Sequence, residues 1–173
     1  MESLDERLGH LKPKPEEIER KGRFLAYYDQ LGLIGIGEAF DFIAQGYDDY
    51  LMLLREIGLE ESVDELVKVC SEGCINLSRD EKLKILMRQV EEAKPYSCII
   101  SLLLGELGVK EAIPHILTHL STSSNLSSWW DIYALKRLGC DEIRLERAVA
   151  KYQCNVKSPV FRRQASNELR YGK

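Results

Sequence analysis

The sequence predicts an all-α fold built from short helix pairs that stack on one another. Helix start and stop signals recur along the chain, apolar residues repeat at helical spacing, and one helix–turn–helix pattern occurs three times. A convincing alternating strand pattern and an Asn-Gly hairpin are both absent from the sequence. A length of 173 residues is typical of one domain, so we expect a single domain over residues 1–173.

Polar caps, prolines and glycines mark where the helices begin and end. Pro15 stands before two acids, Ser78 and Glu81 form the ends of a capping box, and Ser158 precedes Pro159. Glycines that follow apolar helical patterns are typical C-terminal stops. They are Gly46, Gly58, Gly73, Gly108 and Gly139. These signals predict helices over residues 15–30, 36–45, 48–57, 61–73, 79–93, 96–107, 110–120, 128–138, 142–153 and 159–170.

The repeated pattern is clearest in "LLLGELGVKEAIPHIL", which covers residues 102–117. Weaker copies are "LLREIGLEESVDEL" over 53–66 and "ALKRLGCDEIRLERAV" over 134–149. In each copy a helix ends at a glycine, and after a short turn a second helix returns with its apolar face toward the first. Pro114 is tolerated because first-turn N–H groups lack intrahelical partners. A single hairpin cannot cover its own apolar face, so we expect the copies to stack.

The stretch over 102–117 resembles the HEAT-like repeat of phycobilin lyases and other bacterial helical-repeat proteins. The matching residues are Leu104, Gly105, Leu107, Gly108, Ala112, Ile113, Pro114 and Leu117. In the third copy Lys136 stands where the first glycine would be. The resemblance implies a short right-handed α-α superhelix over 47–173, while residues 1–46 depart from the pattern and are expected to form an N-terminal helical cap. Proteins of this family share a scaffold and no single activity.

Charge is divided unevenly along a chain of formal net charge −4. Residues 38–72 hold ten acids and two bases, and residues 134–173 hold ten bases and four acids. Such an acidic segment can attract a basic partner, although solvated helix faces explain the same pattern. The acids expected to contact a partner are Asp48, Asp49, Glu60, Glu61, Asp64 and Glu65.

Two histidines and two aromatic residues complete the predicted contact surface. His115 and His119 are four residues apart on one helix, opposite its apolar stripe, so we expect both to be exposed. This spacing can chelate zinc, but solvated surface or partner contact is the simpler interpretation because no third ligand follows from the sequence. Trp129 and Tyr133 point away from the predicted core stripe of their helix. They suit partner contact, with packing against the preceding repeat as the alternative.

Catalytic and metal-binding motifs are not found in the sequence. The stretch "GLIGIG" over 32–37 lacks the spacing of a nucleotide-binding loop, and no cysteine has a histidine near it in the sequence. Cys70 and Cys74 are interpreted as small buried apolar residues. Five cysteines at irregular spacing indicate a reducing compartment, and the acidic N-terminus does not resemble a signal peptide. We therefore expect a cytoplasmic protein with no catalytic site, metal or cofactor.

We predict a non-enzymatic protein-binding module that holds a basic partner and is itself a monomer or weak dimer. A bacterial immunity protein that neutralises a nuclease toxin is one such module. Two alternatives stay open. One is a lyase or chaperone-type subunit, as the phycobilin-lyase resemblance implies. The other is weak nucleic-acid binding through the C-terminal run that contains Phe161, Arg162, Arg163, Arg170 and Tyr171, against which the sequence pI of about 5.5 argues.

Overall fold

A computed structural model of the chain describes residues 47–71, 76–94, 96–125 and 127–172, apart from the side chain of Asp49. These residues form helices and no strands, which confirms the all-α prediction. The elements are α4 (Asp48–Ile57), α5 (Leu59–Cys70), α6 (Arg79–Glu91), α7 (Ser97–Leu107), the 3-10 helix η1 (Lys110–Ala112), α8 (Ile113–Thr122), α9 (Trp130–Arg137), α10 (Glu142–Asn155) and α11 (Pro159–Tyr171). The helices predicted over 15–30 and 36–45, the 1–46 cap, the 32–37 turn and Cys74 lie outside the described residues.

Most of the described residues that were predicted to begin or end a helix lie at a helix end in the structure. The Ser78 hydroxyl accepts a hydrogen bond from the Glu81 N–H at 3.2 Å, and the Glu81 carboxylate accepts one from the Ser78 N–H at 2.9 Å, which completes the capping box. Gly108 ends α7 in the left-handed region with φ 72°. Helix α11 begins after Ser158 as predicted, but the Ser158 side chain makes no capping hydrogen bond.

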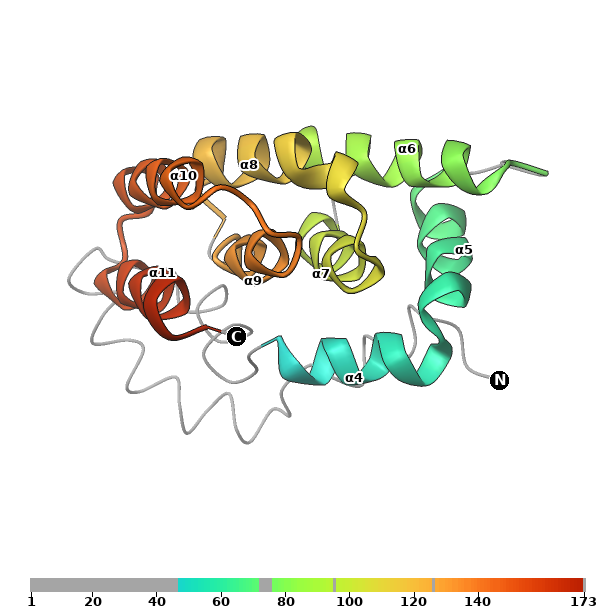
Figure 1. Ribbon diagram of the computed structural model, residues 1–173, viewed down its shortest axis with the longest axis horizontal. Coiled ribbons are helices and arrows are strands. Elements are labelled where there is room, and N and C mark those ends of the chain that lie inside the picture. The colour runs from blue at the N-terminus through green and yellow to red at the C-terminus, as the bar shows by residue number, and fades with distance from the viewer. Residues whose placement is uncertain (1–46, 72–75, 95, 126, 173) are drawn as a thin grey trace.

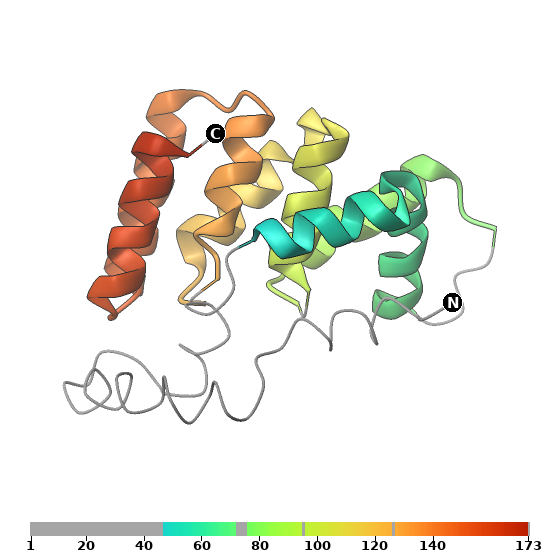
Figure 2. The same cartoon turned by 90° about the horizontal axis from the view of Figure 1, so that it is seen from below.

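The helices after α5 are arranged in two layers. Helices α7, α9 and α11 stand side by side, and α8 and α10 pack against them as a second layer (Figures 1 and 2). Helix α6 packs beside α8, while α5 packs against α6 and α7 at one end of the stack, where α4 also contacts α7. The core between the layers is apolar. Its fully buried side chains include Leu86, Ile100, Leu102, Leu103, Leu104 and Ile116.

The first glycine of the repeat pattern lies where α7 and α9 come closest. A Cβ atom on Gly105 would be 2.9 Å from the Cα atom of Ala134, so only glycine allows this approach. The corresponding position in the next copy is Lys136. Its ammonium group donates hydrogen bonds to the carbonyl oxygens of Glu168, Leu169 and Gly172, the first two at the C-terminal end of α11. Lys136 therefore connects α9 to α11 through the last turn of α11.

Within the described ranges, none of the helices is both long enough and apolar enough to cross a membrane. The described cysteines are free thiols, and Cys70 is half-buried. The cytoplasmic location and the oligomeric state stay predictions.

Candidate functional site

A hollow of about 660 Å³ is lined by residues of α4, α9 and α11. We call it the aromatic groove. Its lining includes Tyr47, Asp48, Met52, Arg55, Trp129, Tyr133, Glu168 and Tyr171. Three of these residues, Asp48, Trp129 and Tyr133, belong to the contact surface predicted from the sequence. The groove is the place where the structure brings predicted residues from distant segments together.

The floor of the groove consists of packed aromatic rings. The Tyr47 ring lies 5.7 Å from Trp129 and 4.7 Å from Tyr133, measured between ring centroids. Trp129 and Tyr133 are only 6% and 4% exposed, so both are packed inside the protein and little of either side chain is open to a partner. The reason is that Tyr47 covers them from the segment before α4. The buried Trp129 Nε1 has no hydrogen-bond partner.

The rim of the groove carries exposed apolar side chains. Met52 and Tyr171 are 56% and 79% exposed, and both line the groove. Among the described residues, one other large hydrophobic side chain, that of Ile143, is comparably exposed. Apolar side chains that gather around a hollow and stay in contact with water are typical of an interaction site.

The groove also has an excess of negative charge. Asp48 is exposed and forms no ion pair with any described residue. Glu168 is half-buried and accepts a hydrogen bond from the Tyr47 hydroxyl at 2.8 Å. Burial raises the pKa of Glu168 and the Asp48 charge raises it further, while the Tyr47 hydrogen bond and Lys136 act in the opposite direction. A positive group placed between Asp48 and Glu168 would relieve this repulsion.

Glu106 of α7 contacts two residues that line the groove, Arg55 and Tyr133. Its carboxylate accepts hydrogen bonds from Arg55 at 3.0 Å and from the Tyr133 hydroxyl, and it lies 3.2 Å from the Arg137 guanidinium. Burial alone raises the pKa of Glu106, but the hydrogen bonds from Tyr133 and Arg55 outweigh burial, and the pKa is lowered. Burial and the Glu106 charge in turn raise the pKa of Tyr133 to about 12. Glu106 thus joins α4, α7 and α9.

Replacing Glu106 by glutamine should lower the free energy of unfolding by about 2 kcal/mol at neutral pH, since hydrogen bonds to a charged group are lost. Because the folded-state pKa of Glu106 is lowered, its contribution is present above the ordinary glutamate pKa and is lost as the pH falls through the folded value. Urea denaturation of both proteins at pH values from neutral to acidic measures this. The stability difference should shrink with acidification; a constant difference would contradict the prediction.

Two of the six acids predicted to contact a partner, Glu60 and Asp64, form ion pairs with bases of α6. Arg79 contacts both carboxylate oxygens of Glu60, at 2.9 and 3.1 Å, and the Lys82 ammonium lies 2.6 Å from Asp64. Glu65 lies 3.7 Å from the Lys68 ammonium. Glu61 is exposed and forms no ion pair with a described residue. The side chain of Asp49 lies outside the described part of the structure.

The two histidines do not form a shared surface or a chelating pair. His115 is half-buried and lies 2.7 Å from the Glu91 carboxylate. His119 is 1% exposed, so its predicted exposure is wrong. Its ring turns inward because the Asp131 carboxylate of α9 lies 2.5 Å from its Nδ1 atom. Zinc chelation by His115 and His119 together, which the sequence analysis set aside, finds no support in this geometry.

The basic C-terminal run is only partly available for contact with nucleic acid. Phe161, which was expected to contribute to such contact, is buried in the core. The Arg162 guanidinium donates a hydrogen bond to the Val156 carbonyl oxygen at 2.7 Å. Arg163, Arg170 and Tyr171 are exposed.

Tyr47, Met52 and Glu168 line the groove but were not predicted from the sequence. Met52 is one turn from Asp48 on α4, so helical spacing could have indicated it. The position of Glu168 in the groove depends on how α11 packs, and no local sequence pattern indicates it.

Comparison of the chain with protein-family models, curated proteins and solved structures finds no match in any of the three. The HEAT-like resemblance therefore rests on the sequence motif.

Proposed function

We propose that the chain is a HEAT-like repeat module, a right-handed superhelix of helix pairs, that binds a basic segment of a partner protein in the aromatic groove. The observation that carries this proposal is the combination of exposed Met52 and Tyr171 with the like-charged acids Asp48 and Glu168 in one hollow. Aromatic side chains supply binding energy when a partner buries them, and an exposed carboxylate such as that of Asp48 favours lysine or arginine.

A nuclease toxin would belong to this class of partner, since surfaces that bind nucleic acid carry lysine and arginine. The immunity role therefore stays a prediction within the broader proposal. It would require the groove to bind a basic surface of the toxin and prevent its contact with phosphates. The lyase-type role and nucleic-acid binding also stay predictions, and no observation in the groove favours either of them.

The groove can be tested without knowing the partner, by selecting ligands for the wild-type protein from a random-peptide display library. Selected peptides should be enriched in lysine and arginine next to apolar residues, and added salt should weaken their binding. Replacing Asp48 by lysine should reduce their affinity about 10-fold or more. Replacing Tyr171 by alanine should cost about 30-fold, as expected for an aromatic anchor. Isothermal titration calorimetry measures both.

The matched control is Glu61→Lys, which makes the same charge change at an exposed position on α5. It should leave the affinity within about 2-fold of wild type, because an exposed surface charge that does not line the groove affects affinity little. Equal losses for Asp48→Lys and Glu61→Lys would assign binding to the overall acidity of the chain. Selection of peptides without basic residues would contradict the proposal directly.

A further inference from the structure

Three buried side chains with metal-binding chemistry meet between consecutive helices. Cys98 of α7, His119 of α8 and Asp131 of α9 each place one potential ligand atom within 4.8 Å of the other two. Their residues are 7%, 1% and 0% exposed. The cluster is separate from the aromatic groove, because the two sites share no lining residue.

The cluster has an unused acceptor. The Asp131 Oδ2 atom lies 2.5 Å from His119 Nδ1, but the buried Oδ1 atom has no hydrogen-bond partner. Burial raises the pKa of Asp131, and interactions with His119 and the nearby Ser101 hydroxyl partly oppose this rise; the Ser101 hydroxyl itself has no hydrogen-bond partner among the described residues. A buried carboxylate oxygen without a partner costs free energy, so it requires an explanation such as an absent ion.

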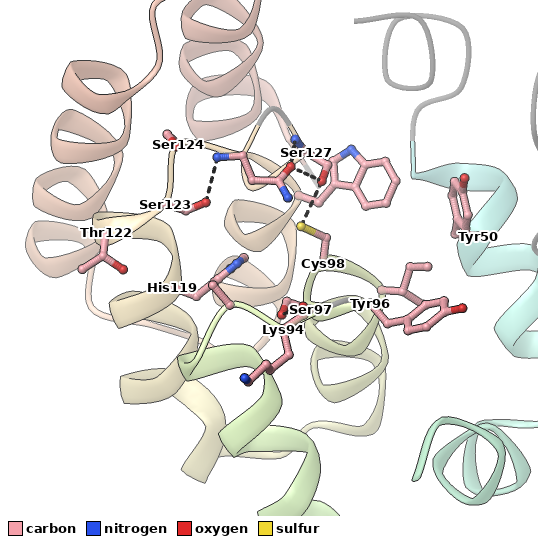
Figure 3. Close-up of a pocket in the computed structure, with 14 residues that line it drawn as sticks. Tyr50, Lys94, Tyr96, Ser97, Cys98, His119, Thr122, Ser123, Ser124 and Ser127 are labelled. Atoms are coloured by element: carbon pink, nitrogen blue, oxygen red, sulfur yellow. Dashed lines mark hydrogen bonds between the residues drawn. The ribbon is translucent and has the colours of Figure 1, made fainter. Parts of the chain in front are cut away.

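The thiol of the cluster is held in place and open to a hollow. The Ser127 Oγ atom lies 3.0 Å from the Cys98 sulfur and 2.9 Å from the Asn125 Oδ1 atom, which accepts its proton. Cys98 and His119 line a hollow of about 790 Å³, which they enter from α7 and α8 (Figure 3).

We propose that Cys98, His119 and Asp131 bind one zinc ion whose fourth coordination position faces this hollow. One sulfur, one nitrogen and one oxygen donor suit Zn²⁺, whereas Mg²⁺ and Ca²⁺ take oxygen ligands. On binding, the thiol loses its proton and the proton between His119 and Asp131 is displaced. A thiolate, a carboxylate, a neutral imidazole and Zn²⁺ sum to zero charge, which suits a buried site. Three protein ligands and one open position are the arrangement that lets zinc hold water.

Three measurements with added metal on the purified full chain test this inference. After incubation with zinc and removal of loose ions by a chelating resin, elemental analysis should find one zinc per chain. Titration with Co²⁺ in place of zinc should produce the near-ultraviolet absorption of a cobalt–thiolate bond. Zinc should also raise the midpoint of thermal unfolding, because an ion that binds only the folded state stabilises it.

The decisive variant is Cys98→Ser, which keeps the size of the side chain and removes the thiolate. It should lose the cobalt–thiolate band and bind zinc at least about 10-fold more weakly. Cys154→Ser is the matched control, because Cys154 is an exposed thiol outside the cluster, and it should keep both properties. Wild type without stoichiometric zinc, a band that persists in Cys98→Ser, or a band that disappears in Cys154→Ser would each overturn the proposal.

Discussion

Replacing His119 by leucine is expected to lower the free energy of unfolding by about 3–5 kcal/mol in metal-free protein. Leucine fills a similar volume with an apolar side chain, but it leaves the fully buried Asp131 carboxylate without its histidine partner. Removing one member of a buried charged pair is costly because the other member stays out of water without compensation. Urea denaturation followed by circular dichroism, with a chelator present, measures the change.

A double variant distinguishes the loss of the His119–Asp131 interaction from the loss of packing around the two residues. His119→Leu combined with Asp131→Ala removes both polar groups, so most of the lost stability should return. Breaking the exposed Lys82–Asp64 ion pair by Lys82→Met is the matched control and should cost less than about 1 kcal/mol. If the double variant were as unstable as His119→Leu, the ring of His119 would matter for its shape and not for its partner.

The helix boundaries could be predicted because their signals are local. A capping box places its two hydrogen bonds within four residues, as Ser78 and Glu81 do. Gly58, Gly108 and Gly139 have positive φ values, which glycine adopts more readily than other residues because it has no Cβ atom. The all-α class followed from these signals. The handedness of the stack depends on angles between helices, for which the sequence offers only the HEAT-like resemblance.

Exposure was predicted less well, because a single apolar stripe was assigned to each helix. That rule suits a helix with one covered side. Helix α9 instead lies between α7 and α11 and beneath α8 and α10, and every residue from Trp130 to Leu135 is buried. Trp129 and Tyr133 are covered by Tyr47 in addition to these helices. In stacked hairpins the inner helices have more than one covered face.

The remaining features depend on contacts between segments far apart in the chain. Arg79 and Lys82 neutralise acids that lie 19 and 18 residues before them, so counting charges along the sequence overestimated the acidic face. Three separate helices contribute the cluster of Cys98, His119 and Asp131, and no short sequence motif indicates it. Only the spacing of His115 and His119 was visible in the sequence, and in the structure each of them lies against a different carboxylate, that of Glu91 and that of Asp131.

Replacing Gly105 by valine is expected to lower the free energy of unfolding by about 2–3 kcal/mol. The new Cβ atom would lie 2.9 Å from the Cα atom of Ala134, and two further methyl groups would add to the overlap. Because the nearest atom belongs to the backbone of α9, a change of side-chain rotamer cannot relieve the contact, and the two helices must separate. The slightly better helix propensity of valine offsets only about 0.4 kcal/mol of the cost.

The control for Gly105→Val is Ala150→Val on the exposed face of α10. It introduces the same side chain into a helix without a neighbour to overlap, so only helix propensity changes, by about 0.6 kcal/mol. Urea denaturation of both variants gives the two free energies directly. A Gly105→Val cost no larger than the control would mean that α7 and α9 do not approach closely in solution. The glycine in the repeat would then need a reason other than helix contact. A clear excess over the control would tie the repeated Leu-Gly pattern to the distance between stacked helices.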